Sequence, residues 1–173
     1  NKARRAAELS KSDLVTDMVG EFDDLQGVMG RDYALHDGEK TEVAEALFEQ
    51  YLPRFSGDIV PSTNTGIALA LADRLDSLAG IFSIGQQPSG SRDPFALRRA
   101  SLGVLRIMLE RNIDLDLADL LALSIANLNL KKEAKITAQE LQKQVLTYVL
   151  DRFISMYKEK GLATEVLDRK STR

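Results

Sequence analysis

Few side chains in this sequence are suited to chemistry, and the first to consider is the pair His36-Asp37. A histidine beside an aspartate can supply two ligands to a divalent metal ion. His36 is the only histidine in the chain and there is no cysteine, so zinc sites, Ser-His-Asp triads and thiol chemistry are disfavoured. Gly38 follows the pair and indicates a helix end, where a histidine complements the negative helix terminus. We therefore expect a structural role for His36.

A second set of candidates comes from a resemblance to HD-domain phosphohydrolases, which bind a metal through a His-Asp dyad. Residues 6–15 are similar to the helix that carries the dyad, and residues 72–76 to the later helix that carries the last aspartate ligand. On this resemblance Ser12 replaces the histidine, while Asp13 and Asp73 remain. Two carboxylates without an imidazole hold a metal weakly, which implies a degenerate site without bound metal. The alternative is that Asp13 and Asp73 pair with arginine or lysine near the core.

The third set consists of arginines in the stretch 88–105, where a Ser/Gly loop leads into a predicted helix. Asp93-Pro94 is a helix start signal, with a carboxylate cap followed by proline. The free amides near Asp93, together with Arg92, Arg98 and Arg99, could receive phosphates, and Arg106 is a further candidate. The alternative is that these arginines pair with acids such as Asp73 and Asp76.

The elements that position these residues are helical by their apolar spacing, and no strand pattern is found. The sequence predicts an all-α fold of about seven helices, with a short further helix from Ala163. Thr41 is a predicted cap, and Thr137 with Glu140 a predicted capping box. The predicted helices cover residues 6–19, 23–35, 41–51, 67–84, 93–111, 116–126 and 137–161. We expect one domain over 1–126, a hinge over 127–136 and the start of another region over 137–173.

Composition sets further limits on the function. The 173 residues are 44% hydrophobic and 28% charged, which is enough for a core and a soluble surface. A net charge of −3 argues against a general nucleic-acid coat but permits a local basic face. There is no bilayer-spanning apolar run, and the lack of cysteine fits a reducing cytoplasm. Both ends suggest a piece of a longer protein.

Several separate motifs follow one another along the chain. They are Lys11-Ser12-Asp13-Leu14-Val15-Thr16, Leu25-Gln26-Gly27-Val28-Met29-Gly30, Glu49-Gln50-Tyr51-Leu52-Pro53-Arg54-Phe55, Ala70-Leu71-Ala72-Asp73-Arg74-Leu75-Asp76 and Asp93-Pro94-Phe95-Ala96-Leu97-Arg98-Arg99. In this order they resemble the β subunit of the two-subunit glycyl-tRNA synthetase. The resemblance is clearest over residues 4–112, and the region around 148–161 resembles the start of that family's C-terminal anticodon-binding region.

The resemblance implies a function and partners. Such enzymes are α2β2 assemblies that join glycine to tRNA(Gly) using ATP, with the catalytic site, ATP and Mg²⁺ at the α subunit. The fragment would be most of an HD-like helical domain, without catalytic residues or a cofactor of its own, in a cytoplasmic ligase. We expect it to contact tRNA and to act as a scaffold. The alternatives are a metal-dependent HD-type phosphohydrolase and a purely structural interdomain scaffold.

Overall fold

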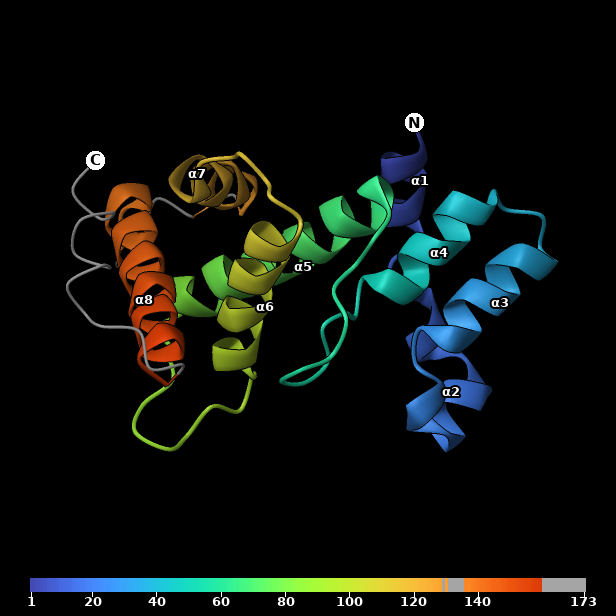
Figure 1. Cartoon of the computed structure of the whole chain (residues 1–173), viewed down its shortest axis with the longest axis horizontal. Helices are drawn as coiled ribbons and strands as arrows, with labels where there is room; N and C mark the ends of the chain where they lie inside the picture. The colour runs from blue at the N-terminus through green and yellow to red at the C-terminus, as the bar shows by residue number, and fades with distance from the viewer. Residues whose placement is uncertain (129, 131–135, 160–173) are drawn as a thin grey trace. The chain divides into compact units, whose positions relative to one another are not determined.

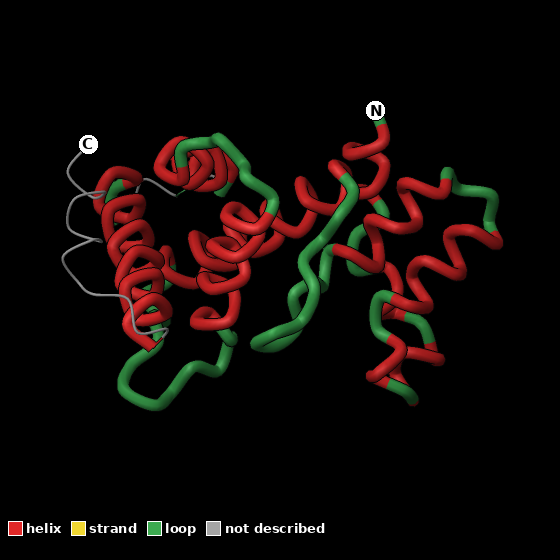
Figure 2. The backbone as a smooth tube through the Cα atoms, viewed as in Figure 1, coloured by secondary structure: helices red, strands yellow, loops and turns green. Residues whose placement is uncertain are grey.

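The chain is helical throughout its described part (Figures 1 and 2). The computed structural model describes residues 1–128, 130 and 136–159. Within these residues there are eight α-helices, two short 3-10 helices and no strand, apart from an isolated bridge between Ser89 and Arg92. The all-α prediction is confirmed there, with one more α-helix than the seven expected. Most of the predicted hinge over 127–136 and the helix predicted from Ala163 lie outside the described residues.

The helices follow one another along the chain, with two longer loops over residues 50–63 and 84–96. In order they are α1 (Lys2–Glu8), η1 (Ser12–Val15), α2 (Asp17–Glu21), η2 (Asp23–Leu25), α3 (Val28–His36), α4 (Thr41–Glu49), α5 (Asn64–Ser83), α6 (Leu97–Glu110), α7 (Leu117–Asn127) and α8 (Ala138–Glu159). None of the helices in the described part is long and apolar enough to cross a membrane.

The single helix predicted over 6–19 is wrong, because the chain breaks twice in that stretch. Lys11 has a left-handed backbone, with φ of 61°, which ends the helical path after α1. Thr16 is extended and caps α2 by accepting a hydrogen bond from the amide of Val19 at 3.4 Å. The predicted buried side is correct only in part, because Ala6 and Val19 are buried. The other predicted residues on that side include three that are exposed, Leu14, Val15 and Met18.

Three predicted helix starts are also wrong. The helix predicted from Asp23 begins at Val28, because a short 3-10 helix over Asp23–Leu25 ends before Gly27, whose φ is 82°. Thr41 is the first residue of α4 rather than its cap, and Lys40 precedes it without a capping side chain. The helix predicted from Asp93 begins at Leu97, because Ala96 is left-handed, with φ of 53°. In contrast, α7 begins close to the predicted start at Asp116, which is its cap, and Thr137 and Glu140 form the predicted capping box before α8.

The backbone groups into two compact units, which we describe separately. The first unit contains Asn1–Arg74 and Arg106–Ile113, and the second contains Leu75–Leu105 and the described residues from Asp114 onward. The predicted division into residues 1–126, a hinge and residues 137–173 stays a prediction.

The core of the first unit is built from small and branched apolar residues of α1, α3, α4 and the start of α5. Alanines on facing helices allow their backbones to approach closely. Glu49, at the end of α4, accepts hydrogen bonds from the amides of Ser62 (2.7 Å) and Thr63 (3.1 Å), just before α5 begins. The buried core residues are Ala6, Ala34, Val43, Ala44, Ala46, Leu47 and Leu69.

In the second unit, α7 and α8 pack against each other, and Phe82 of α5 meets Tyr148 of α8 edge to face, with ring centroids 5.2 Å apart. Gln142 of α8 donates a hydrogen bond to the carbonyl of Ala118 at 2.8 Å. The loop that precedes α6, residues 84–96, belongs to the same unit. The unit's buried apolar residues include Leu75, Leu78, Ala79, Phe82, Leu97, Val104, Leu105, Leu121, Ile125, Leu141, Val145 and Val149.

Candidate functional site

Asp13 is a buried carboxylate, only 2% exposed, in the short helix η1. The amide of Gly27 donates to its Oδ2 at 2.6 Å, and the hydroxyl of Tyr51 donates to its Oδ1 at 2.8 Å. Gly30 brings α3 against this side chain, since a Cβ there would lie 3.3 Å from that of Asp13. Both carboxylate oxygens therefore have partners from elsewhere in the unit.

Asp73 lies on α5 and binds a cation supplied by the chain itself. The ammonium of Lys11 is 3.1 Å from Asp73 Oδ2 and 4.4 Å from the centre of the Tyr51 ring. Burial raises the pKa of the Tyr51 hydroxyl, as do its hydrogen bond to Asp13 and the charges of Asp13 and Asp73. Tyr51 thus stays protonated and donates to Asp13, while Lys11 compensates the charge of Asp73.

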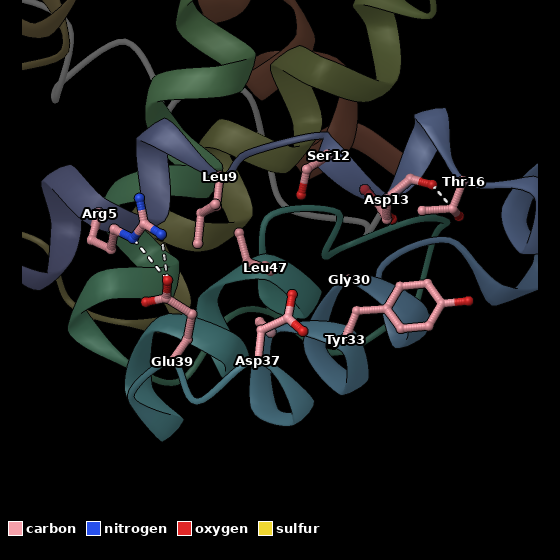
Figure 3. Close-up of a pocket in the computed structure, with 11 residues that line it drawn as sticks. Arg5, Leu9, Ser12, Asp13, Thr16, Gly30, Tyr33, Asp37, Glu39 and Leu47 are labelled. Carbon is pink, nitrogen blue, oxygen red and sulfur yellow. Dashed lines mark hydrogen bonds and ion pairs between the residues drawn. The ribbon is translucent and has the colours of Figure 1, made fainter.

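A cavity of about 570 Å³ lies beside Asp13 (Figure 3). Ser12, Asp13 and Thr16 line it from η1 and the residue that follows, and the hydroxyl of Thr16 donates to the carbonyl of Asp13 at 2.7 Å. Across the cavity, Arg5 donates from Nε to Glu39 at 2.9 Å, and this ion pair joins α1 to the residues before α4. Asp73 is not among the lining residues.

Ser12 and Asp13 line the cavity, and Asp13 also accepts from the hydroxyl of Tyr51. Asp73 pairs with Lys11, whose ammonium lies over the same tyrosine ring. His36 is the last residue of α3, which is the helix-end position expected for it. Among the described residues, no three histidine, aspartate or glutamate side chains come close enough together to hold a metal ion.

The second candidate is the loop before α6 in the second unit. Asp93 accepts from the amide of Leu97 at Oδ1, at 2.8 Å, and from that of Arg98 at Oδ2, at 2.9 Å. The carboxylate thus occupies two amides at the start of α6. The expectation that free amides near Asp93 receive phosphates is wrong for these two groups, because the cap already satisfies them.

Arg98 holds this loop in place. Its guanidinium donates to the carbonyls of Gly90 and Ser91, and Ser89 and Arg92 exchange backbone hydrogen bonds of 3.1 and 2.9 Å. The acids Asp73 and Asp76, considered from the sequence as partners, are not the groups that Arg98 binds. Arg98 therefore stabilises the loop by hydrogen bonding to its backbone carbonyls.

The four arginines predicted to meet phosphates fall into two groups. Arg92 and Arg99 are exposed, and their side chains make no hydrogen bond or ion pair within the described part of the chain. Arg106 lies in the first unit, where it donates to Glu110 at 2.7 Å and to the carbonyl of Asp58 at 2.6 Å. Arg92 and Arg99 are the pair whose guanidinium groups are open to a ligand.

Comparison with known proteins places these features in a family. A family model described as glycyl-tRNA synthetase beta subunit matches residues 1–170. The chain belongs to this family. It is 58% identical over 165 residues to the glycine–tRNA ligase beta subunit of Chromohalobacter salexigens, 54% over 166 residues to that of Haemophilus influenzae and 49% over 164 residues to that of Clostridioides difficile.

These alignments cover 95%, 96% and 95% of this chain, respectively, but only 23%, 24% and 23% of the three relatives. The chain therefore spans about a quarter of the length of these glycyl-tRNA synthetase beta subunits. The resemblance inferred from the motifs is confirmed.

Sequence reasoning missed three residues that shape these sites in this member of the family. Tyr51 was read only as an apolar helix residue, although its hydroxyl binds Asp13. Glu49 and Arg74 are buried charges; Arg74 donates to the carbonyls of Gln50 and Ala70 at 3.0 and 2.9 Å, and burial lowers its pKa. Charged residues within apolar helix patterns were the available signal, since such groups are buried only with partners.

Proposed function

We propose that this chain is a tRNA-contacting and scaffolding part of a glycyl-tRNA synthetase β subunit, with no active site of its own. In this proposal the whole enzyme is a cytoplasmic α2β2 ligase that attaches glycine to tRNA(Gly), and ATP and Mg²⁺ are used at the α subunit. Family membership supports the parent enzyme, because the relatives are named as beta subunits of glycine–tRNA ligase.

The observation that carries RNA contact is the pair of open arginines in the second unit. Arg92 and Arg99 are exposed beside a loop that Asp93 and Arg98 hold in a defined shape. Guanidinium groups bind phosphate oxygens through their planar fork, without reading base sequence. A few such contacts suit a chain whose net charge is −3, since they need only a local basic face.

The scaffolding role is supported by the polar interior of the first unit. We infer an HD-like bundle whose metal chemistry is lost, with Ser12 at the histidine position. The oxygens of Asp13 accept from Gly27 and Tyr51, and Asp73 binds Lys11. The bonds of Asp13 connect η1 to the residue before α3 and to the segment after α4, and the ion pair of Asp73 connects α5 to the residue before η1. In this proposal, groups that could have held a metal instead stabilise the helices.

The test is the double variant Arg92→Ala with Arg99→Ala in the intact synthetase. Loss of two phosphate contacts is expected to weaken tRNA binding and to lower the slope of log affinity against log salt by roughly two. Fluorescence anisotropy with labelled tRNA(Gly) over a salt series measures both quantities. Arg4→Ala is the matched control, because Arg4 is also exposed but pairs with Glu8 in the first unit.

Two results would decide against the proposal. Unchanged affinity and salt slope in the double variant would assign this chain a purely structural role. An equal loss in the Arg4→Ala control would mean that general charge, rather than the loop, governs binding.

A further inference from the structure

The loop before α6 borders an open surface hollow that the phosphate contacts do not explain. Its volume is about 480 Å³, within the range of about 300–1,000 Å³ typical of small-ligand sites. Gln86, Gln87 and Ser89 line it from the start of the loop, and Arg92 with Asp93, Pro94 and Phe95 from its end. The hollow lies within the second unit.

The lining combines three kinds of group. Phe95 is an aromatic side chain that is 44% exposed, although its neighbour Leu97 is fully buried. Gln86 and Gln87 are exposed amides that can both donate and accept, and Arg92 adds an open guanidinium. An aromatic face, amides and a cation together match the base, its polar edge and the phosphate of a nucleotide.

Asp93 is the one acidic residue in the described lining, and both of its carboxylate oxygens already accept hydrogen bonds. Both oxygens of Asp93 accept amide hydrogens at the positive N-terminal end of α6, and Arg98, whose amide is one of these donors, follows closely. The repulsion of a phosphate by this carboxylate is thereby reduced. Arg92 is left as the charge with no partner in the described lining.

The loop is also held in shape before any ligand arrives. Ser89 and Arg92 pair through their backbones, Arg98 binds the carbonyls of Gly90 and Ser91, and Gln87 donates to Gln144 of α8 at 3.3 Å. A site that is already ordered loses less entropy on binding.

We propose that this hollow binds one unpaired nucleotide of the tRNA, with Phe95 stacking on the base, Gln86 and Gln87 contacting its edge and Arg92 binding its phosphate. The inference rests on the proposed function, because RNA must reach the loop. The proposed function needs only contacts with RNA phosphates. The nucleotide site also requires a base of the tRNA that is unpaired and unstacked. Arg98 is a positioning residue that keeps the loop open.

Phe95→Ala in the intact synthetase tests the stacking. We expect tRNA(Gly) affinity to fall by roughly ten-fold, with the salt slope unchanged because no ion pair is lost. Phe95→Tyr is expected to keep the affinity. Phe55→Ala is the matched control, since Phe55 is 63% exposed and lies in a loop of the first unit.

A crosslinking experiment locates the contact. Benzoylphenylalanine at position 95 is expected to crosslink to a single unpaired nucleotide of tRNA(Gly), and at position 55 to give no such product. Crosslinks in a base-paired stem, absence of a crosslink at position 95, or unchanged affinity of Phe95→Ala would overturn the inference. If the Arg92 and Arg99 double variant still lowers affinity and salt slope in that case, the proposed function stands and only the nucleotide site fails.

Discussion

A buried carboxylate such as that of Asp13 is stable only when both oxygens accept hydrogen bonds, because burial without partners carries a large desolvation cost. Tyr51 supplies one of these bonds and is itself partly buried, which raises the pKa of its hydroxyl and keeps the proton in place. The two residues therefore depend on each other, and the tyrosine ring also carries the Lys11 ammonium above it.

Tyr51→Phe is the test of this dependence at the residue scale. The substitution keeps the ring and removes only the donor, so the charged Asp13 loses a hydrogen bond. We expect the free energy of unfolding to fall by about 2 kcal/mol, the typical contribution of a hydrogen bond to a charged group. Urea unfolding of the chain measures it.

Tyr33→Phe is the matched control, because Tyr33 is 38% exposed and its hydroxyl makes no hydrogen bond within the described residues. Equal stability of the Tyr51→Phe variant and the parent chain would show that the hydrogen bond to Asp13 is not stabilising.

At the scale of the element, α8 shows how local sequence determines where a helix begins. Thr137 accepts from the amide of Glu140 at 3.2 Å, and Glu140 accepts from the amide of Thr137 at 2.9 Å. The bonds from Thr137 lower the pKa of Glu140. Because the folded pKa is depressed, this contribution to stability is present at neutral pH and is lost as the pH falls through that pKa.

Thr137→Ala should lower the free energy of unfolding by about 1 kcal/mol, as for other lost caps. Glu140→Gln should destabilise at pH 7, and the difference from the parent chain should shrink as acidification protonates the glutamate of the parent. Chemical unfolding at several pH values measures both effects. A constant difference for Glu140→Gln from pH 7 to pH 3 would contradict the assigned role of the carboxylate.

The elements that the sequence predicted correctly are those whose signals are local. Apolar spacing predicted α7, and apolar spacing with a capping box predicted α8, because these signals depend on residues three or four positions apart. The left-handed backbones of Lys11 and Ala96 were missed, since neither residue type favours that conformation. The Asp13–Tyr51 and Lys11–Asp73 contacts join residues 38 and 62 positions apart, which no local pattern encodes.

For the whole molecule, two hypotheses compete. The chain is either an active phosphohydrolase or a non-catalytic part of a larger enzyme. The first unit has a cavity and carboxylates, but Asp13 accepts hydrogen bonds from within the unit and Asp73 is paired with Lys11. The second unit has open arginines and a shaped loop. The proposed RNA contact rests on the arginines of the second unit, and the proposed scaffolding role rests on the polar interior of the first unit.

Manganese provides a test on the whole chain. Because Lys11 places a positive charge at Asp73 and Asp13 is fully hydrogen-bonded, we expect added Mn²⁺ to leave the thermal midpoint unchanged. No hydrolysis of bis(p-nitrophenyl) phosphate should follow. Calorimetry and a colorimetric assay measure these outcomes, with an EDTA-treated sample as the control. Metal-dependent turnover would establish a phosphohydrolase instead.

The left-handed backbone of Lys11 limits which amino acids can occupy position 11. A φ of 61° favours glycine or asparagine, and a lysine there is strained by about 1–2 kcal/mol. Neither favoured residue carries a charge that could reach Asp73 and lie over Tyr51. The backbone conformation at position 11 therefore favours a residue without a charged side chain, whereas Asp73 favours a cationic one. Glycine would relax the turn and leave the partly buried carboxylate without its cation, whereas arginine would keep the charge and the strain together.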